Sequence, residues 1–160
     1  MKNDIANLRQ QLLNYLEGRH AHASLEDALK DFPLKMANIK PANVPYTFWA
    51  LLEHIRITQN DIVEFIQNPN YKYKNWPKDY WPPMHKLADK IAWHKTIQAC
   101  KKDLKVLKRI INNPKTDLLA NIPHGEGQTI FREAMLVIDH NAYHLGEFIL
   151  MRRSLNIWPK

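Results

Sequence analysis

Hydrophobic residues recur at intervals of three and four along four long stretches of the chain, the spacing of one face of a helix. The first stretch extends from about Asp4 to Glu17 and ends at Gly18, a residue type that commonly terminates helices. The second begins near Pro45, which suits a first helical turn, and ends before Asn68-Pro69-Asn70. No stretch alternates as a β-strand would, so the pattern predicts helices throughout.

The third stretch extends from about Met84 to Asn112, before Pro114, and its apolar face consists of Trp93, Ile97, Cys100, Leu104, Leu107 and Ile111. The fourth extends from about Gln128 or Thr129 to Arg153. It is apolar on nearly every side, so we expect neighbours to bury most of its circumference. Arg152 and Arg153 in its last turn suit the negative end of the helix dipole.

The segments between these helices are long. Ser24 and Asp27 have the spacing of a capping box before a short helix over 25–30, and prolines interrupt the linker that follows. The aromatic segment from Tyr71 to Pro83 contains prolines that forbid an α-helix, and we expect its aromatic rings to fold onto the helices. The sequence therefore predicts an all-α four-helix bundle with long inter-helix linkers, in which crossovers or an up-down-down-up order are open.

Composition narrows the class of protein. The 160 residues, 45% hydrophobic and 24% charged, fit one globular domain over 1–160. A single cysteine, Cys100, excludes a disulfide framework, and its place on an apolar face predicts a buried thiol. No membrane-spanning stretch or secretion signal is evident, so we expect a cytoplasmic protein.

The net charge of +7 permits binding to nucleic acid. However, no helix-turn-helix, zinc-finger or RNA-binding signature is present, and we expect neither a nucleic-acid nor a membrane partner. The basic residues of the third helix are interpreted as a solvated face; they are Lys101, Lys102, Lys105, Lys108 and Arg109.

Two histidines in the fourth helix carry the sharpest chemical signal. His140 and His144 are four residues apart, so both rings project from one side and could reach one metal ion at about 2.0–2.1 Å. His54, in the middle of the second helix, is the best candidate for a third ligand. Three histidines leave coordination positions open, and they suit zinc, nickel or another late first-row metal. Spacing alone leaves a core or surface histidine pair equally open.

The remaining histidines and tryptophans are interpreted as packing or surface residues. We expect His85 and His94 in the third helix to be solvated, and His124 to lie on the surface. The tryptophans expected to pack are Trp49, Trp76, Trp81 and Trp93, and Trp76 and Trp81 could also form the wall of a pocket.

The string TIFREAMLVIDHNAYHLGEFILMRRSLNIWP resembles the last helix of the DinB-like proteins, and NVPYTFWALLEHIRITQNDIVEFI resembles their second helix. This resemblance implies a four-helix bundle that holds a divalent metal through His54, His140 and His144. Many relatives have glutamine at the position of Glu147, so Glu147 could bond to metal-bound water, bind the metal or accept a bond from a ligand. By the same resemblance, His20 or His22 could line the mouth of the site, and a loop-packing role is equally open.

The resemblance implies a metal-dependent enzyme, either a hydrolase or a low-molecular-weight-thiol S-transferase, that acts on a small molecule. Relatives include bacillithiol S-transferases and a mycothiol-dependent maleylpyruvate isomerase. Glu147 is the candidate catalytic residue, and no Ser-His-Asp or Cys-His arrangement supports covalent catalysis. The alternative is a non-catalytic metal-binding or ligand-binding module of a stress response, and a homodimer fits either function.

Overall fold

The computed structural model describes residues 2–18 and 21–159 and is all-helical over these ranges. The α-helices are α1 (Lys2–Glu17), α2 (Leu25–Leu29), α3 (Phe48–Gln67), α4 (Lys90–Asn112) and α5 (Ile130–Ser154), with 3-10 turns at Leu34–Met36 and Lys78–Tyr80. The all-α prediction is confirmed, because the described ranges contain no strand and only an isolated bridge between Asn121 and Thr129.

Several helix ends follow the expected capping chemistry. Gly18 follows α1 with a φ of 73°, a left-handed conformation that costs glycine little. Ser24 and Asp27 form the expected capping box of α2. Thr129 caps α5, and Thr47 caps α3, where its hydroxyl accepts a hydrogen bond from the backbone of Ala50 at 3.1 Å. The start of α3 is therefore three residues beyond the expected proline.

The expected start of the third long helix at Met84 is wrong, because α4 begins at Lys90. Asp89 is the N-cap and accepts a hydrogen bond from the backbone N–H of Ala92 at 2.7 Å. The side-chain amide of Asn38 bonds both backbone groups of Ala88, at 2.8 and 2.9 Å. This distant amide satisfies the backbone that a longer helix would otherwise use.

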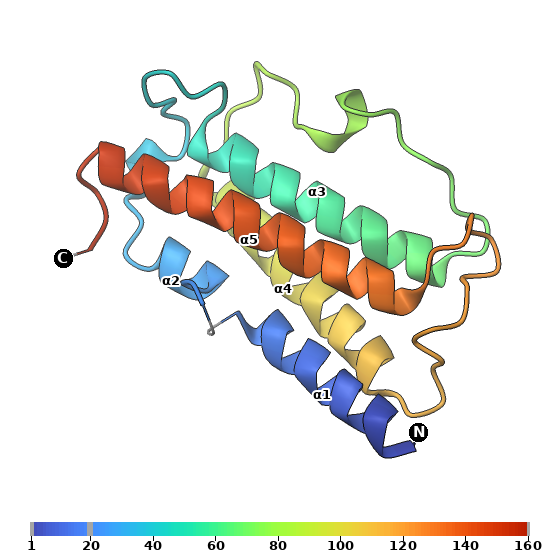
Figure 1. The fold of residues 1–160 in the computed structure, drawn as a ribbon. Helices are drawn as coiled ribbons and strands as arrows, with labels where there is room; N and C mark the ends of the chain where they lie inside the picture. The colour runs from blue at the N-terminus through green and yellow to red at the C-terminus, as the bar shows by residue number, and fades with distance from the viewer. Residues whose placement is uncertain (1, 19–20, 160) are drawn as a thin grey trace.

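The four long helices lie side by side, with α1 and α5 in one direction and α3 and α4 in the other (Figure 1). Hydrogen bonds agree with the parallel arrangement of α3 and α4, since Trp49 reaches Thr96 at 3.2 Å and Gln59 reaches the Cys100 carbonyl at 2.7 Å. The chain therefore returns along the full length of α3 through residues 68–89. The order up, down, down, up is one of those that the long linkers left open.

Two apolar clusters form the core, and polar residues separate them. Along α3 the first cluster ends at Leu52 and the second begins at Ile62. Along α5 the second cluster ends at Val137 and the first begins at Leu145. His54, and the pair of histidines on α5, occupy the intervening turns. The interruption of the apolar core thus coincides with the candidate site.

One side of α5 is exposed, contrary to the expectation that neighbours would bury most of its circumference. Met135, Tyr143 and Leu150 are 45%, 65% and 67% exposed. The packing partners of α5 in the described chain, α1, α2 and α3, leave this side uncovered. Within the described ranges, no helix combines the length and hydropathy needed to cross a membrane.

Candidate metal centre

The structure brings the three predicted histidines together. His54 comes from α3, and His140 and His144 come from successive turns of α5. Nε2 of His54 lies 3.1 Å from Nε2 of His144 and 3.1 Å from Nε2 of His140. One nitrogen from each ring lies within 4.8 Å of the others, so the group could hold a metal ion. The rings of His54 and His144 are buried, and that of His140 is half-buried.

The aromatic segment after α3 fixes the orientation of the His54 ring. Nδ1–H of His54 donates to the backbone carbonyl of Tyr80 at 2.7 Å. The indole of Trp81 stacks on the imidazole, with ring centroids 3.9 Å apart and planes 1° from parallel. Trp81 therefore forms a wall of the site, which is one of the two roles left open for it.

Glu147 lies one turn beyond His144 and holds the second ring. Nδ1–H of His144 donates to Oε2 of Glu147 at 2.6 Å, and the hydroxyl of Tyr46 donates to the same side chain. Burial and this hydrogen bond raise the pKa of Tyr46 above its ordinary value, so the phenol stays protonated. Of the roles left open for Glu147, the contacts show acceptance of a hydrogen bond from the histidine.

These contacts decide which nitrogens carry protons. A carbonyl oxygen and a carboxylate accept hydrogen bonds, so Nδ1 of His54 and Nδ1 of His144 are the protonated nitrogens. In each neutral ring Nε2 then presents a lone pair. The 3.1 Å contact between them places two lone pairs face to face, which is repulsive unless a cation lies between the rings.

Burial also favours neutral rings at this site. It lowers the pKa of His140 to about 4, with further contributions from the neighbouring His144 and His54. Burial likewise lowers the pKa of His54 below its ordinary value. Imidazole must be unprotonated to bind a metal, so the environment prepares these rings for that role at neutral pH.

Two buried polar residues near the histidines were missed by the sequence analysis. Asp61 and Gln59 lie on α3 between apolar residues and are 6% and 1% exposed. Gln59 donates to the Cys100 carbonyl and accepts from the Asn141 amide at 3.0 Å, so it links three helices. Their position on an apolar helix face was the available signal.

The other histidines lie apart from this group. His85 and His94 are exposed as expected, although His85 precedes α4. His124, expected on the surface, is only partly exposed, because its Nε2 contacts the Phe65 carbonyl at 2.6 Å. Trp49 and Trp93 are buried as expected, whereas Trp76 is 72% exposed.

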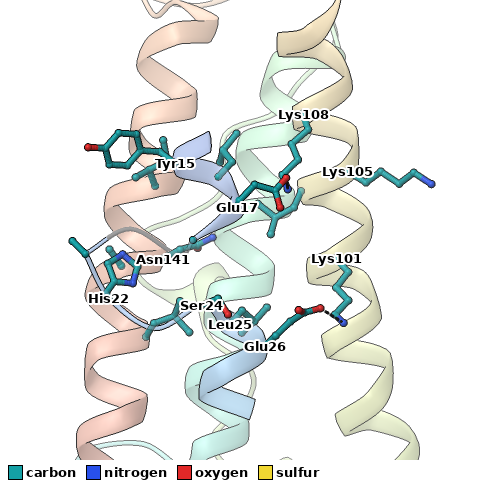
Figure 2. A pocket seen from close by; sticks show the side chains of 17 residues that line it. Tyr15, Glu17, His22, Ser24, Leu25, Glu26, Lys101, Lys105, Lys108 and Asn141 are labelled. Carbon is teal, nitrogen blue, oxygen red and sulfur yellow. Dashed lines mark hydrogen bonds and ion pairs between the residues drawn. The ribbon is translucent and has the colours of Figure 1, made fainter. Parts of the chain in front are cut away.

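His22 lines a different cavity, between the end of α1, the segment before α2, α4 and α5, with a volume of about 580 Å³ (Figure 2). Asn141 and Leu145 of α5 also line it, but none of the three clustered histidines does. His20 lies outside the described residues. The expectation that His22 lines the mouth of the histidine site is therefore not supported.

The basic side of α4 has a structural role in addition to being solvated. Lys101 pairs with Glu26 at 3.0 Å and Lys108 pairs with Glu17 at 2.5 Å, which connects α4 to α2 and α1. Cys100 on the opposite side is fully buried, and burial raises the pKa of its thiol to about 12. The expectation of a buried thiol is confirmed.

Comparison of the chain with protein-family models, curated proteins and solved structures gives no match. The geometry of the three histidines is therefore the basis for inferring a function.

Proposed function

We propose that His54, His140 and His144 bind one divalent metal ion, with zinc or nickel as the best-suited ions. The observation that carries the proposal is the convergence of three Nε2 atoms, two of which present lone pairs at 3.1 Å. Nitrogen ligands at 2.0–2.1 Å in a tetrahedral site lie about 3.3 Å apart, so the observed spacing fits such an ion. The ion would remove the repulsion between the lone pairs.

We further propose that the protein is a metal-dependent enzyme of the DinB-like type, a hydrolase or a low-molecular-weight-thiol S-transferase. In this interpretation α1, α3, α4 and α5 are the four helices of the family's bundle, and the histidines occupy its ligand positions. An ion held by three imidazoles supplies a Lewis acid with coordination positions left for substrate. The chain itself supplies the indole of Trp81, which covers the His54 ring, and the hydrogen-bonded pair of Tyr46 and Glu147.

Glu147 supports a second candidate, a metal-binding module without turnover. Its carboxylate accepts hydrogen bonds from His144 and Tyr46, which orients the ligand and leaves it poorly placed to remove a proton from a substrate. The two candidates share the metal site and differ in whether bound substrate reacts.

Metal content tests the shared part of the proposal. Protein purified without a histidine tag should contain about one divalent ion per chain by elemental analysis. His54→Ala and His140→Ala should each lose it, because two imidazoles bind far more weakly than three. His94→Ala, which removes an exposed histidine from α4, is the matched control. Unchanged metal content in both site variants would contradict the assignment.

Turnover separates the enzyme from the module. A thiol and an aryl chloride are suitable probes, because the carbon–sulfur bond forms as chloride leaves and the thiol proton passes to solvent. The enzyme predicts turnover that chelation abolishes and added zinc or nickel restores, and an ester probe tests the hydrolase in the same way. Stoichiometric metal without turnover of either probe would favour the module.

A further inference from the structure

Asp61 lies two turns beyond His54 on α3 and is nearly buried, with 6% of its surface exposed. It accepts hydrogen bonds from the hydroxyls of Tyr71 at 2.9 Å and Tyr80 at 2.7 Å, and it forms an ion pair with Lys74. A buried carboxylate is costly unless it is paired and hydrogen-bonded, and this one has a cation and two hydroxyl donors. All three partners belong to the segment that follows α3.

The same segment supplies the contacts that hold His54. Tyr80 is bound at both ends, since its hydroxyl donates to Asp61 and its carbonyl accepts from Nδ1–H of His54. The next residue, Trp81, stacks on the His54 ring. A continuous path of contacts therefore connects the Asp61 carboxylate with the orientation and tautomer of the His54 imidazole.

We propose that Asp61 is a positioning residue of the histidine site, an inference that rests on the proposed metal-binding function. By holding the segment 71–81 against α3, it keeps the Tyr80 carbonyl at Nδ1 of His54. The ring is thereby fixed with its proton on Nδ1, and Nε2 faces His140 and His144. Without this anchor, no contact favours the Nδ1–H tautomer of His54, because a neutral imidazole can carry its proton on either nitrogen.

Asp61→Asn tests the inference by metal binding. The amide keeps the size of the side chain but loses the charge that pairs with Lys74, and we expect Co²⁺ to bind about tenfold more weakly, as when the partner of a ligand is removed. Visible absorption of Co²⁺ during the titration reports affinity and the ligand field. Asp103→Asn is the matched control, because Asp103 is 7% exposed on α4 and bonds to Asn60 instead of the segment 71–81. Equal Co²⁺ affinities of the two variants would overturn the inference.

Nitrogen NMR of histidine-labelled, metal-free protein supplies a measurement that does not depend on the ion. The spectrum of the native chain should show the His54 ring protonated on Nδ1, identified by the signal that His54→Ala removes. Asp61→Asn should convert this signal to a mixture of tautomers, whereas Asp103→Asn should not. A pure Nδ1–H signal in Asp61→Asn would overturn the inference even if metal affinity fell.

Two further comparisons complete the test. Tyr80→Phe removes one hydrogen bond to Asp61 and keeps the backbone carbonyl. It should therefore change the Co²⁺ affinity and the His54 tautomer in the same direction but by less. This variant replaces Asp61→Asn if the latter does not fold. If the native chain binds no Co²⁺, the proposed function fails, and the tautomer measurement still tests the role of Asp61.

Discussion

His140 is the half-buried member of the three clustered histidines, and burial lowers its pKa to about 4. In an unfolded chain a histidine has a pKa near 6.5. Between these two values the unfolded state binds more protons than the folded state. The metal-free protein should therefore be fully stabilised by this group above about pH 6.5 and lose that stability as the pH falls toward 4.

Urea unfolding of the EDTA-treated protein between pH 4.5 and 7.5 measures this effect. For one histidine the free energy of unfolding should fall by up to about 1.4 kcal/mol per pH unit in this range. His140→Asn should reduce the slope, and His94→Asn, at an exposed position, should leave it unchanged. An identical slope in all three proteins would show that His140 is not shielded from protons.

Glu147 leads to a prediction that separates an orienting carboxylate from a metal ligand. Glu147→Gln keeps an oxygen that can accept from Nδ1–H of His144, so zinc affinity should change by only a few fold. Glu147→Ala should weaken zinc binding by about 10–100-fold while stoichiometric binding persists at high zinc. Competition with a chromophoric chelator measures both affinities, with Glu64→Ala at an exposed position of α3 as control. Loss of stoichiometric zinc in Glu147→Ala, as complete as in His144→Ala, would make Glu147 a ligand.

At the residue scale, the sequence could predict that His140 and His144 project from one side of a helix, because that placement follows from their spacing. Two histidines four apart share one side of a helix whatever the surrounding fold. The hydrogen-bond partners that orient the histidine rings were harder to predict from the sequence. The acceptor for His54 is a backbone carbonyl of Tyr80, and a carbonyl has no signature in the sequence. The role of Asp61 likewise depends on hydroxyls brought to it by a distant segment.

Arg152, near the end of α5, connects this helix to α2 and to the segment that follows α5. Its guanidinium is fully buried and donates to the carbonyls of Ala28 and Lys30 at the end of α2, and to the carbonyl of Ile157 after α5. Arg152 and Arg153 lie in the last turn of α5 as expected, and Arg152 in addition makes direct hydrogen bonds to the end of α2 and to the segment after α5. The cation also lies over the ring of Trp158, 5.1 Å from its centroid.

Removal of this guanidinium should destabilise the fold strongly. Arg152→Met leaves several carbonyls without a donor, and we expect the free energy of unfolding in urea to fall by about 3 kcal/mol. Arg153→Met is the matched control, since Arg153 is the exposed neighbour in the same turn, and it should change stability by less than about 0.5 kcal/mol. Equal effects of the two substitutions would contradict the bridging role of Arg152.

At the element scale, apolar periodicity predicted the existence of all four long helices, whereas helix boundaries depended on tertiary contacts. The start of α4 is the clearest case, because the amide of Asn38 holds the backbone of Ala88 from a distant linker. The exposed side of α5 has a similar origin. The sequence shows that Met135 and Leu150 are apolar, but only the arrangement of the other helices shows that nothing in the described chain covers them.

At the scale of the whole molecule, the parallel arrangement of α3 and α4 explains both the long linker and the site. The chain must return along α3 to begin α4 (Figure 1). This return places the Tyr80 carbonyl and the Trp81 ring against His54. The sequence could predict long linkers but left their path open, because several helix orders have equally long connections. In the observed order, the segment that the topology requires between α3 and α4 also forms a wall of the candidate metal centre.

The most direct test of the central claim is X-ray absorption spectroscopy of the zinc-loaded native chain. Ligation by all three histidines predicts one zinc environment with three imidazole nitrogens at about 2.0–2.1 Å, and in His54→Ala either loss of the bound zinc or at most two imidazole nitrogens around any zinc that remains. A zinc environment with at most one imidazole, unchanged by His54→Ala, would contradict the claim that α3 and α5 together hold the metal.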